Sequence, residues 1–306
     1  MYLTDYVTTF GQAMRKKYGY AVHKLALDAE FTCPNRDGSK GRGGCSFCNN
    51  VSFSPHGRKP KTIPEQITTG QKVIRSQKPV DRFLAYFQAY TNTYADVAVL
   101  KILYDQALAQ PGVVGLSVGT RPDCVPDEVL DLLASYQDQG YEIWLELGLQ
   151  SSFDSTLDKV NRGHDYACYR EAIKSAHVRD LSVCTHLIMG LPGESETHYK
   201  TSLNRVLENG VEGLKFHPLH VVKGTQLANE WRRGEYQSLH FNDYVQIAAD
   251  LIELTPAEII FHRLTGTATP NILLSPEWCS GKWSVLNAIT EELKIRKSYQ
   301  GSKLTG

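Results

Sequence analysis

Short apolar runs alternate with amphipathic stretches along most of the chain. The runs are rich in Val, Ile, Leu and aromatic residues, as expected of strands that are covered on both faces. They predict seven strands, at 23–31, 83–88, 113–119, 141–147, 182–189, 213–217 and 258–261. The spacing of apolar residues between them predicts helices between Thr93 and Pro111, from Pro126 to Gly140, from Asp165 to about 178, at 194–209 and at about 282–297. The last helix is expected to bury a stripe of Trp283, Leu286, Ile289 and Leu293.

Alternation of strands and helices favours parallel β/α units. Six or so units are too few for a complete eight-stranded barrel. A partial barrel or an open doubly wound sheet remains, and the pattern does not choose between them. In both architectures, ligands bind at the C-terminal ends of the strands. Chemically active residues are therefore expected directly after the predicted strands.

Three cysteines lie in one glycine-rich loop after the first predicted strand. Cys33, Cys45 and Cys48 have the spacing C-x11-C-x2-C, and the loop before the second cysteine reads GRGG at 41–44. A four-iron cubane held by three thiolates keeps one iron without a protein ligand, open to a small molecule. Glycines suit such a loop because the backbone must fold closely around the cluster.

The same cysteines could instead hold zinc. Together with His56 they would make a closed Cys3His set, and the chain would then be a non-catalytic nucleic-acid-binding module. The cysteines alone support zinc and an iron–sulfur cluster equally well.

Composition limits the partners that the chain can have. Of its 306 residues 42% are hydrophobic, and Lys+Arg and Asp+Glu both number 33, so a nucleic acid would have to meet a local basic patch. The seven cysteines are an odd number and no secretory signal pattern is visible, which predicts reduced thiols in the cytoplasm. No apolar run approaches the roughly 18 residues that span a bilayer, so no membrane partner is expected.

Five later segments follow predicted strands in a fixed order: LSVGTRPD at 116–123, LELGLQS at 145–151, NRGH at 161–164, LIMGLPGE at 187–194 and HPLHVVKGT at 217–225. With the cysteine loop, in which Phe47 precedes the last cysteine, they resemble the radical SAM superfamily. The wide C-x11-C spacing is similar to the branch related to the catalytic subunit of Elongator, and most closely to the small YhcC/YtqA-type proteins. The likeness extends from His23 to about Thr267.

This resemblance implies an α/β fold with a partial (β/α)6-type radical SAM barrel at 23–262. An N-terminal segment at 1–22 would precede the barrel, and a C-terminal helical extension at 263–306 would pack on it. It also implies a [4Fe–4S] cluster on Cys33, Cys45 and Cys48 that cleaves S-adenosylmethionine (SAM) to a 5′-deoxyadenosyl radical. A reducing electron donor such as flavodoxin or ferredoxin would supply the electron.

The same resemblance suggests which residues contact SAM. In related enzymes the residues at Gln150 and Arg162 touch SAM, and an arginine can pair with its carboxylate. The glycine-rich turn that usually meets the SAM amino group is replaced here, so Gln88, Tyr90 or Thr91 would take its place. His186, at a position that is Asp in some relatives, is a further candidate.

The substrate implied by the resemblance is tRNA, with modification of the wobble uridine side chain. Candidate contacts to its backbone are Arg36, Lys40, Arg42, Arg58, Lys59 and Lys61, with Lys294, Arg296 and Lys297 near the C-terminus. Solvated surface charge explains these groups equally well. A small metabolite, such as a tetrapyrrole precursor, is the alternative substrate.

Four residues are candidates for catalysis itself. His217, His220 and Lys223 cluster after the sixth predicted strand and could act in proton transfer. Cys124 could donate a hydrogen atom to a radical. The remaining cysteines, at 168, 184 and 279, are expected to be small buried hydrophobic residues.

Overall fold

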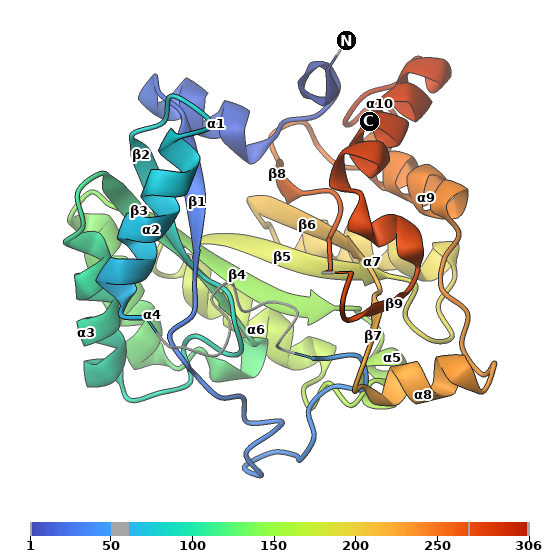
Figure 1. The fold of residues 1–306 in the computed structure, drawn as a ribbon, viewed down its shortest axis with the longest axis horizontal. Helices are drawn as coiled ribbons and strands as arrows, with labels where there is room; N and C mark the ends of the chain where they lie inside the picture. Colours follow the sequence, from blue (N-terminus) through green and yellow to red (C-terminus); the bar gives the residue numbers. More distant parts are fainter. Residues whose placement is uncertain (1, 50–60, 269, 305–306) are drawn as a thin grey trace.

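Seven parallel strands form one sheet that curls into a half-barrel (Figure 1). The computed structural model describes residues 2–49, 61–268 and 270–304. The strands are β1 Val22–Leu27, β2 Arg82–Phe87, β3 Val113–Thr120, β4 Glu142–Gln150, β5 Ser182–Met189, β6 Gly213–Pro218 and β8 Ile260–Arg263. They lie side by side in chain order, so the order never reverses as it does in a doubly wound sheet. The partial barrel is therefore confirmed.

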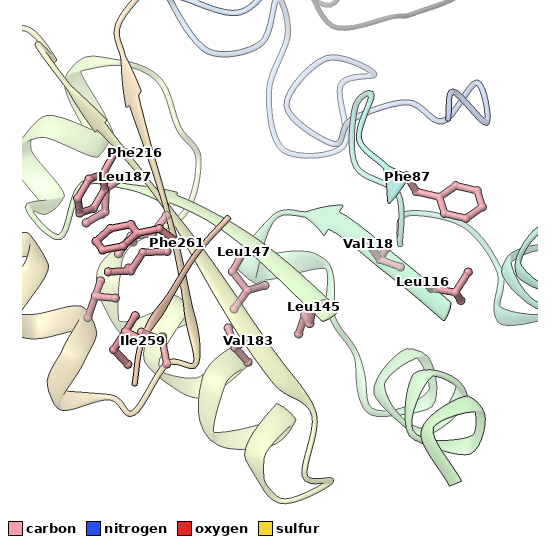
Figure 2. Packing of buried hydrophobic residues seen from close by; sticks show 14 of the residues in the cluster. Phe87, Leu116, Val118, Leu145, Leu147, Val183, Leu187, Phe216, Ile259 and Phe261 are labelled. Carbon is pink, nitrogen blue, oxygen red and sulfur yellow. The ribbon is translucent and has the colours of Figure 1, made fainter. Parts of the chain in front are cut away.

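Helices cover the outer face of the half-barrel (Figure 1). The main ones are α2 Ile63–Arg75, α3 Val97–Leu108, α4 Asp127–Asp138, α6 Tyr166–His177, α7 Glu196–Glu208 and α9 Phe241–Glu253. The short elements η3 Pro122–Cys124 and α5 Asp154–Lys159 lie in loops. A cluster of buried apolar side chains fills the layer between strands and helices, and Figure 2 shows part of it. Within the described parts of the chain, no helix has both the length and the apolar character needed to cross a membrane.

The first strand ends earlier than the sequence pattern predicts. β1 stops at Leu27, although the predicted strand extends to Phe31. The side-chain amide of Gln66, on α2, accepts a hydrogen bond from the N–H of Asp28 at 2.9 Å and donates one to its carbonyl at 2.7 Å. Because both backbone groups of Asp28 are occupied in this way, the chain leaves the ladder and turns into the cysteine loop.

The N-terminal residues close the barrel at the end opposite the cysteine loop. The segment comprises η1 Leu3–Asp5 and α1 Phe10–Tyr18, and the N–H of Phe261 donates to the carbonyl of Thr8 at 2.9 Å, which joins the segment to β8. Phe10 and Met14 pack against side chains from inside the barrel, namely Val22, Leu84, Trp144 and Cys184. The N-terminal segment thus supplies the apolar floor of the half-barrel.

The C-terminal residues add a small sheet and a long helix. Strands β7 Val221–Val222 and β9 Leu273–Ser275 pair antiparallel, α8 Gln226–Arg232 follows β7, η4 Glu277–Ser280 follows β9, and α10 Lys282–Arg296 packs on α9. The predicted helix is present, but its buried stripe is Val285, Ile289 and Leu293. Trp283 was expected in this stripe, and its side chain is instead 68% exposed. The buried positions recur every four residues, and Trp283 lies two positions before the first of them, on another face of the helix.

Gly115 in β3 lies directly against the neighbouring strand β4. A Cβ atom at this position would approach the carbonyl oxygen of Glu142 to 1.9 Å and its nitrogen to 2.7 Å. We expect Gly115→Ala to lower the free energy of unfolding by roughly 1–3 kcal/mol, because the two strands must move apart. Gly11→Ala in α1, where an added Cβ meets nothing within 4 Å, should be neutral or slightly stabilising. Equal urea midpoints for the two variants would contradict this expectation.

Candidate functional site

A pocket lies at the C-terminal ends of the strands. Its walls come from the loop after β1, from the ends of β2 to β6 and β8, and from the loop after β6. All residues expected to hold the cluster or SAM line it: Cys33, Cys45, Cys48, Gln88, Tyr90, Thr91, Gln150, Arg162 and His186. His217 and His220 line it too. The structure thus brings these residues into one space, and their individual roles stay predictions.

The cysteine loop is tightly folded. The N–H of Arg36 donates to the carbonyl of Cys33 at 2.8 Å, and the N–H of Cys48 donates to the carbonyl of Cys45 at 3.0 Å. Gly44 has a φ of 84°, and an added Cβ would meet Nε of Arg36 at 2.7 Å. Glycine is therefore required at this position both for its backbone conformation and for its small size.

The segment 160–163 clamps the cysteine loop. The carbonyl of Val160 accepts from the N–H of Ser46 at 3.0 Å, and the side chain of Asn161 donates to the carbonyl of Gly44 at 2.8 Å. Nδ2 of Asn35 donates back to the carbonyl of Asn161. The NRGH motif thus has a structural task that the sequence reading did not foresee, since it fixes the loop that carries the cysteines.

Arg162 links this clamp to the wall of the pocket. Its Nη1 lies 3.5 Å from Sγ of Cys45, and its Nη2 donates to the carbonyl of Gly148 at 2.6 Å. Its Nε is buried without a partner among the described residues. A Cβ on Gly148 would approach Nε2 of Gln150 to 2.8 Å and Nη2 of Arg162 to 2.9 Å. The glycine thus makes room for two polar side chains that face the same pocket.

Two residues of the pocket wall hold an uncommon backbone conformation. Tyr90 has a φ of 62° and Gln150 a φ of 80°, although neither is glycine. Such conformations cost of order 1–3 kcal/mol each and persist where the surrounding structure enforces them, often at functional sites. Gln150 follows a register shift between β4 and β5 after Leu147, which turns the end of β4 toward the pocket.

The cysteine loop fits a cluster with an open coordination site. Three cysteines face the pocket. Two side-chain donors approach the sulfur of Cys45, Nδ2 of Asn35 at 3.7 Å and Nη1 of Arg162 at 3.5 Å. Nε of Arg162 has no partner among the described residues. Within the described residues, no three His, Cys, Asp or Glu side chains are grouped as the ligands of a single metal ion would be. His56, the fourth ligand of the zinc alternative, lies outside the described residues, as do Arg58 and Lys59.

Two predicted catalytic residues lie away from the pocket lining. Cys124 is buried in η3, and burial together with Asp123 raises the pKa of its thiol to about 12. Lys223 is exposed after β7, with its backbone N–H bonded to the carbonyl of Ile272 at 2.8 Å. Neither residue is among those that line the pocket, although Cys124 is near enough to Cys33 for that thiol to contribute to the rise of its pKa.

Arg121 and Asp123 form a buried ion pair at the rim of the pocket. The guanidinium donates to both carboxylate oxygens at 2.8 and 3.0 Å, and Lys40 adds a contact at 2.6 Å. Burial would raise the pKa of Asp123, but the two cations outweigh it and lower this pKa to about 2. The LSVGTRPD segment thus supplies a fixed charge pair next to the cysteine loop.

Glu146 is the centre of a buried charge network inside the half-barrel. Its side chain is fully buried and accepts from Nζ of Lys24 at 2.6 Å, from Nζ of Lys215, and from Nε2 of His186 at 2.9 Å. Nζ of Lys215 also donates to the hydroxyl of Tyr86 at 2.9 Å. Burial alone would raise the pKa of Glu146, but the two lysines hold it well below its usual range. Tyr86 and His186 line the pocket, so the network is continuous with it.

The histidines of the pocket are neutral bases. Burial lowers the pKa of His186 and of His220 to about 4, and lowers that of His217 well below its usual range. Neutral imidazoles can donate or accept one hydrogen bond at each nitrogen. They can therefore orient a polar ligand without adding charge.

Sequence reasoning missed several residues of the site. Arg121, Tyr86 and Arg263 line the pocket, and Lys24 and Lys215 lie beneath it. Arg121 stands in a segment that was singled out, so its position directly after β3 could have identified it. Lys24 and Lys215 fall inside apolar strands, where no local pattern marks their direction.

Two models of known protein families match this chain. The model of the radical SAM superfamily matches residues 37–206, and that of the radical SAM C-terminal domain matches residues 211–295. Protein YhcC of Escherichia coli (strain K12) is 48% identical over 304 residues, which cover 99% of this chain and 97% of that protein.

Elongator-type proteins are similar over shorter or more divergent regions. Elongator complex protein 3 of Schizosaccharomyces pombe is 29% identical over 154 residues, which are 49% of this chain and 28% of that one. The solved structure of Elp3 from the archaeon Methanocaldococcus infernus, lacking residues 1–46, has a TM-score of 0.69 at 17% identity and covers 91% of this chain and 64% of that one. The fold is thus shared with Elp3. The chain belongs to the radical SAM superfamily, whose members are enzymes that use a [4Fe–4S] cluster and S-adenosylmethionine.

Proposed function

We propose that this enzyme holds a [4Fe–4S] cluster on Cys33, Cys45 and Cys48, cleaves SAM, and modifies tRNA at the side chain of the wobble uridine. The observation that carries the first part is the position of Arg162. It touches the sulfur of Cys45 and faces the same pocket as Gln150, so one space can hold a cluster and a ligand bound to it. When bound and reduced, the cluster supplies the electron that splits SAM into methionine and a 5′-deoxyadenosyl radical.

The protein residues position SAM and exclude water. Arg162 and Gln150 serve the amino acid part of SAM, since a guanidinium pairs well with a carboxylate. Gln88, Tyr90, Thr91 and His186 lie on the same wall and would contact the rest of the molecule. The Glu146 network and the N-terminal floor fill the described interior below the pocket, which lies at the C-terminal ends of the strands. A reactive species formed there meets substrate and little solvent.

The tRNA part of the proposal rests on the resemblance to the Elongator branch, which implies a tRNA substrate, together with the similarity to Elongator complex protein 3. Arg36 and Lys40, from the cysteine loop, and Arg42 beside them would meet the tRNA backbone near the pocket. The C-terminal candidates are less suitable. Arg296 is paired with Asp250 and Glu253, and α10 lies beside the N-terminal segment, away from the cysteine loop (Figure 1). The enzyme would work in the cytoplasm with a reductant such as flavodoxin or ferredoxin.

The test is anaerobic turnover with tRNA. The protein is reconstituted with iron and sulfide, reduced with dithionite, and assayed for 5′-deoxyadenosine with and without total tRNA from cells that lack this protein. We expect that tRNA to raise product formation at least tenfold, and the same tRNA digested with nuclease to have no effect. Binding should weaken steeply between 50 and 200 mM salt, since each phosphate contact releases counterions.

Two results would contradict the tRNA assignment. One is a flat response of binding to salt. The other is equal stimulation by intact and nuclease-digested tRNA, or by a small-molecule extract, which would favour a metabolite as substrate. Neither result would affect the assignment of the cluster to the three cysteines.

A further inference from the structure

The strand β8 places two successive side chains inside the half-barrel. Its pairing with β6 joins Leu214 to Phe261 and then Lys215 to Arg263, so His262 is an extra residue between them. Phe261 lies in the apolar cluster under the helices (Figure 2). His262 and Arg263 both face inward, because a bulge of this kind changes the direction of the following side chain.

The contacts of the two residues show their directions. Nδ1 of His262 lies 2.8 Å from Nζ of Lys24, and its ring packs edge-on against Trp144 at 4.3 Å between centroids. Arg263 lines the pocket one step further along the strand, together with Tyr86 and His217. Because of the bulge, His262 packs in the barrel interior and Arg263, the next residue, lines the pocket.

Arg263 is a cation without a counter-ion. It makes no hydrogen bond and no ion pair with the part of the chain that the structure describes. The other arginines of the pocket are engaged: Arg121 with Asp123, Arg36 with the carbonyl of Cys48, and Arg162 with the carbonyl of Gly148. No Asp or Glu is among the described residues that line the pocket. Arg263 is partly buried. A partly desolvated cation is stabilised by an anionic partner, so Arg263 is expected to meet an anion from outside.

Among the described residues, the barrel interior below the pocket does not supply that anion. The nearest acid in the barrel, Glu146, is already matched by two lysines, Lys24 and Lys215. Counting charges with the histidines neutral, these three side chains and Arg263 sum to plus two. These side chains of the barrel interior thus carry a net positive charge beneath the pocket.

Two neutral histidines stand next to Arg263. His217 and His220 line the pocket, and Nε2 of His220 is buried without a partner within the described residues. An added Cβ on Gly266 would meet Nδ1 of His217 at 2.6 Å and Cε1 of His220 at 3.2 Å. The chain after β8 therefore packs closely against both imidazole rings. Arg263 also helps burial to keep both imidazoles uncharged. A guanidinium beside imidazole N–H groups is a suitable arrangement for an oxyanion.

Arg263 lies on β8, whereas the cysteine loop follows β1 and Arg162 follows β4, so Arg263 enters the pocket from a different strand. In the proposed function, Arg162 contacts a cysteine ligand of the cluster and binds the carboxylate of SAM. An anion at Arg263 would therefore belong to the second ligand of the pocket.

We propose that Arg263 binds an anionic group of the substrate, a carboxylate or a phosphate, with His217 and His220 as hydrogen-bonding neighbours. This inference rests on the proposed function only in that the pocket holds SAM and a substrate together. A tRNA could supply the anion from its backbone phosphate or from a carboxylate on a modified base. Arg263 is then a residue that selects substrates by charge.

The test uses small anions and no turnover. The reconstituted protein with SAM bound is melted at constant ionic strength with increasing sodium acetate or inorganic phosphate. We expect a saturable rise in melting temperature, with the anion that gives it identifying carboxylate or phosphate. Arg263→Gln should raise the half-saturating concentration at least tenfold, and Arg263→Lys should restore part of the response. Arg232→Gln, at an exposed arginine on α8, is the matched control and should respond as the wild-type protein does.

Three outcomes would overturn the inference. The wild-type protein and Arg263→Gln could respond alike, or the wild-type protein could show no saturable response to either anion. Arg263→Gln could also lose SAM affinity as much as Arg162→Gln does, which would assign Arg263 to SAM. A failure of tRNA to stimulate turnover, with the anion response intact, would reject tRNA and keep the anion site.

Discussion

Replacing Cys33, Cys45 or Cys48 by alanine is expected to abolish the formation of 5′-deoxyadenosine from SAM. A cluster held by three thiolates has no spare protein ligand, so the loss of one thiolate removes either the cluster or its geometry. Among the described residues beside Cys45, the side chains of Asn35 and Arg162 are hydrogen-bond donors to its sulfur and offer no replacement ligand. Product formation should fall at least a thousandfold in each variant, with iron and sulfide content reported alongside.

Cys168→Ala is the matched control for these variants. Cys168 is a partly exposed thiol at the start of α6 and is not among the residues that line the pocket. We expect this variant to keep its cluster content and its turnover. Retained turnover in Cys33→Ala would sink the cluster assignment. A colourless protein that binds zinc without sulfide, and loses zinc in the same three variants, would favour the nucleic-acid-binding module.

The positions of the strands could be predicted because the face of each strand that packs on helices is apolar. Each strand of the half-barrel touches helices on one side, so Val, Leu and Ile mark its position in the sequence. The predicted strands differ from the observed ones mainly at their ends, as with β1, where the long-range hydrogen bonds of Gln66 end the ladder. Contacts between residues 38 positions apart leave no local signal.

The site was predictable where chemistry and strand ends coincide. The cysteines, Gln150 and Arg162 stand directly after strands or in the loop that follows one, and the structure places them in one pocket. The prediction that Trp283 is buried was wrong, because no chemical motif marks its position. A hydrophobic residue on a helix can face solvent, and only the packing of α10 on α9 decides which stripe is buried.

The polar interior was not predictable from local patterns. Lys24 and Lys215 lie within apolar runs. Successive side chains of a strand point to opposite faces of the sheet, but the sequence pattern does not show which face meets polar partners. In this half-barrel the inward side meets polar partners, since Lys24 donates to Glu146 and to Ser117 at 3.1 Å. Arg263 was missed for a further reason. A bulge shifts its direction by one residue, and a register change has no signature in composition.

Glu146→Gln is expected to have the largest effect on stability. The substitution keeps the shape of the side chain but leaves Lys24 and Lys215 buried without an acid. Removing one member of a buried ion pair costs about 3–5 kcal/mol, because the remaining charge is uncompensated. In a protein of this size we expect a melting temperature lower by roughly 5–15 °C. Glu291→Gln, which breaks an exposed pair with Lys294 on α10, should change it little.

A second substitution separates charge imbalance from lost packing. Glu146→Gln combined with Lys215→Met removes one of the two stranded cations, so the double variant should be more stable than Glu146→Gln alone. Acid provides an independent check. The folded pKa of Glu146 lies below its usual 4.5, so its contribution is present above that pH and is lost as the pH falls toward the folded value. The stability gap between the wild-type protein and Glu146→Gln should therefore narrow below about pH 4.5. A gap that is independent of pH would show that Gln disturbs packing, and that the two lysines do not depend on the carboxylate.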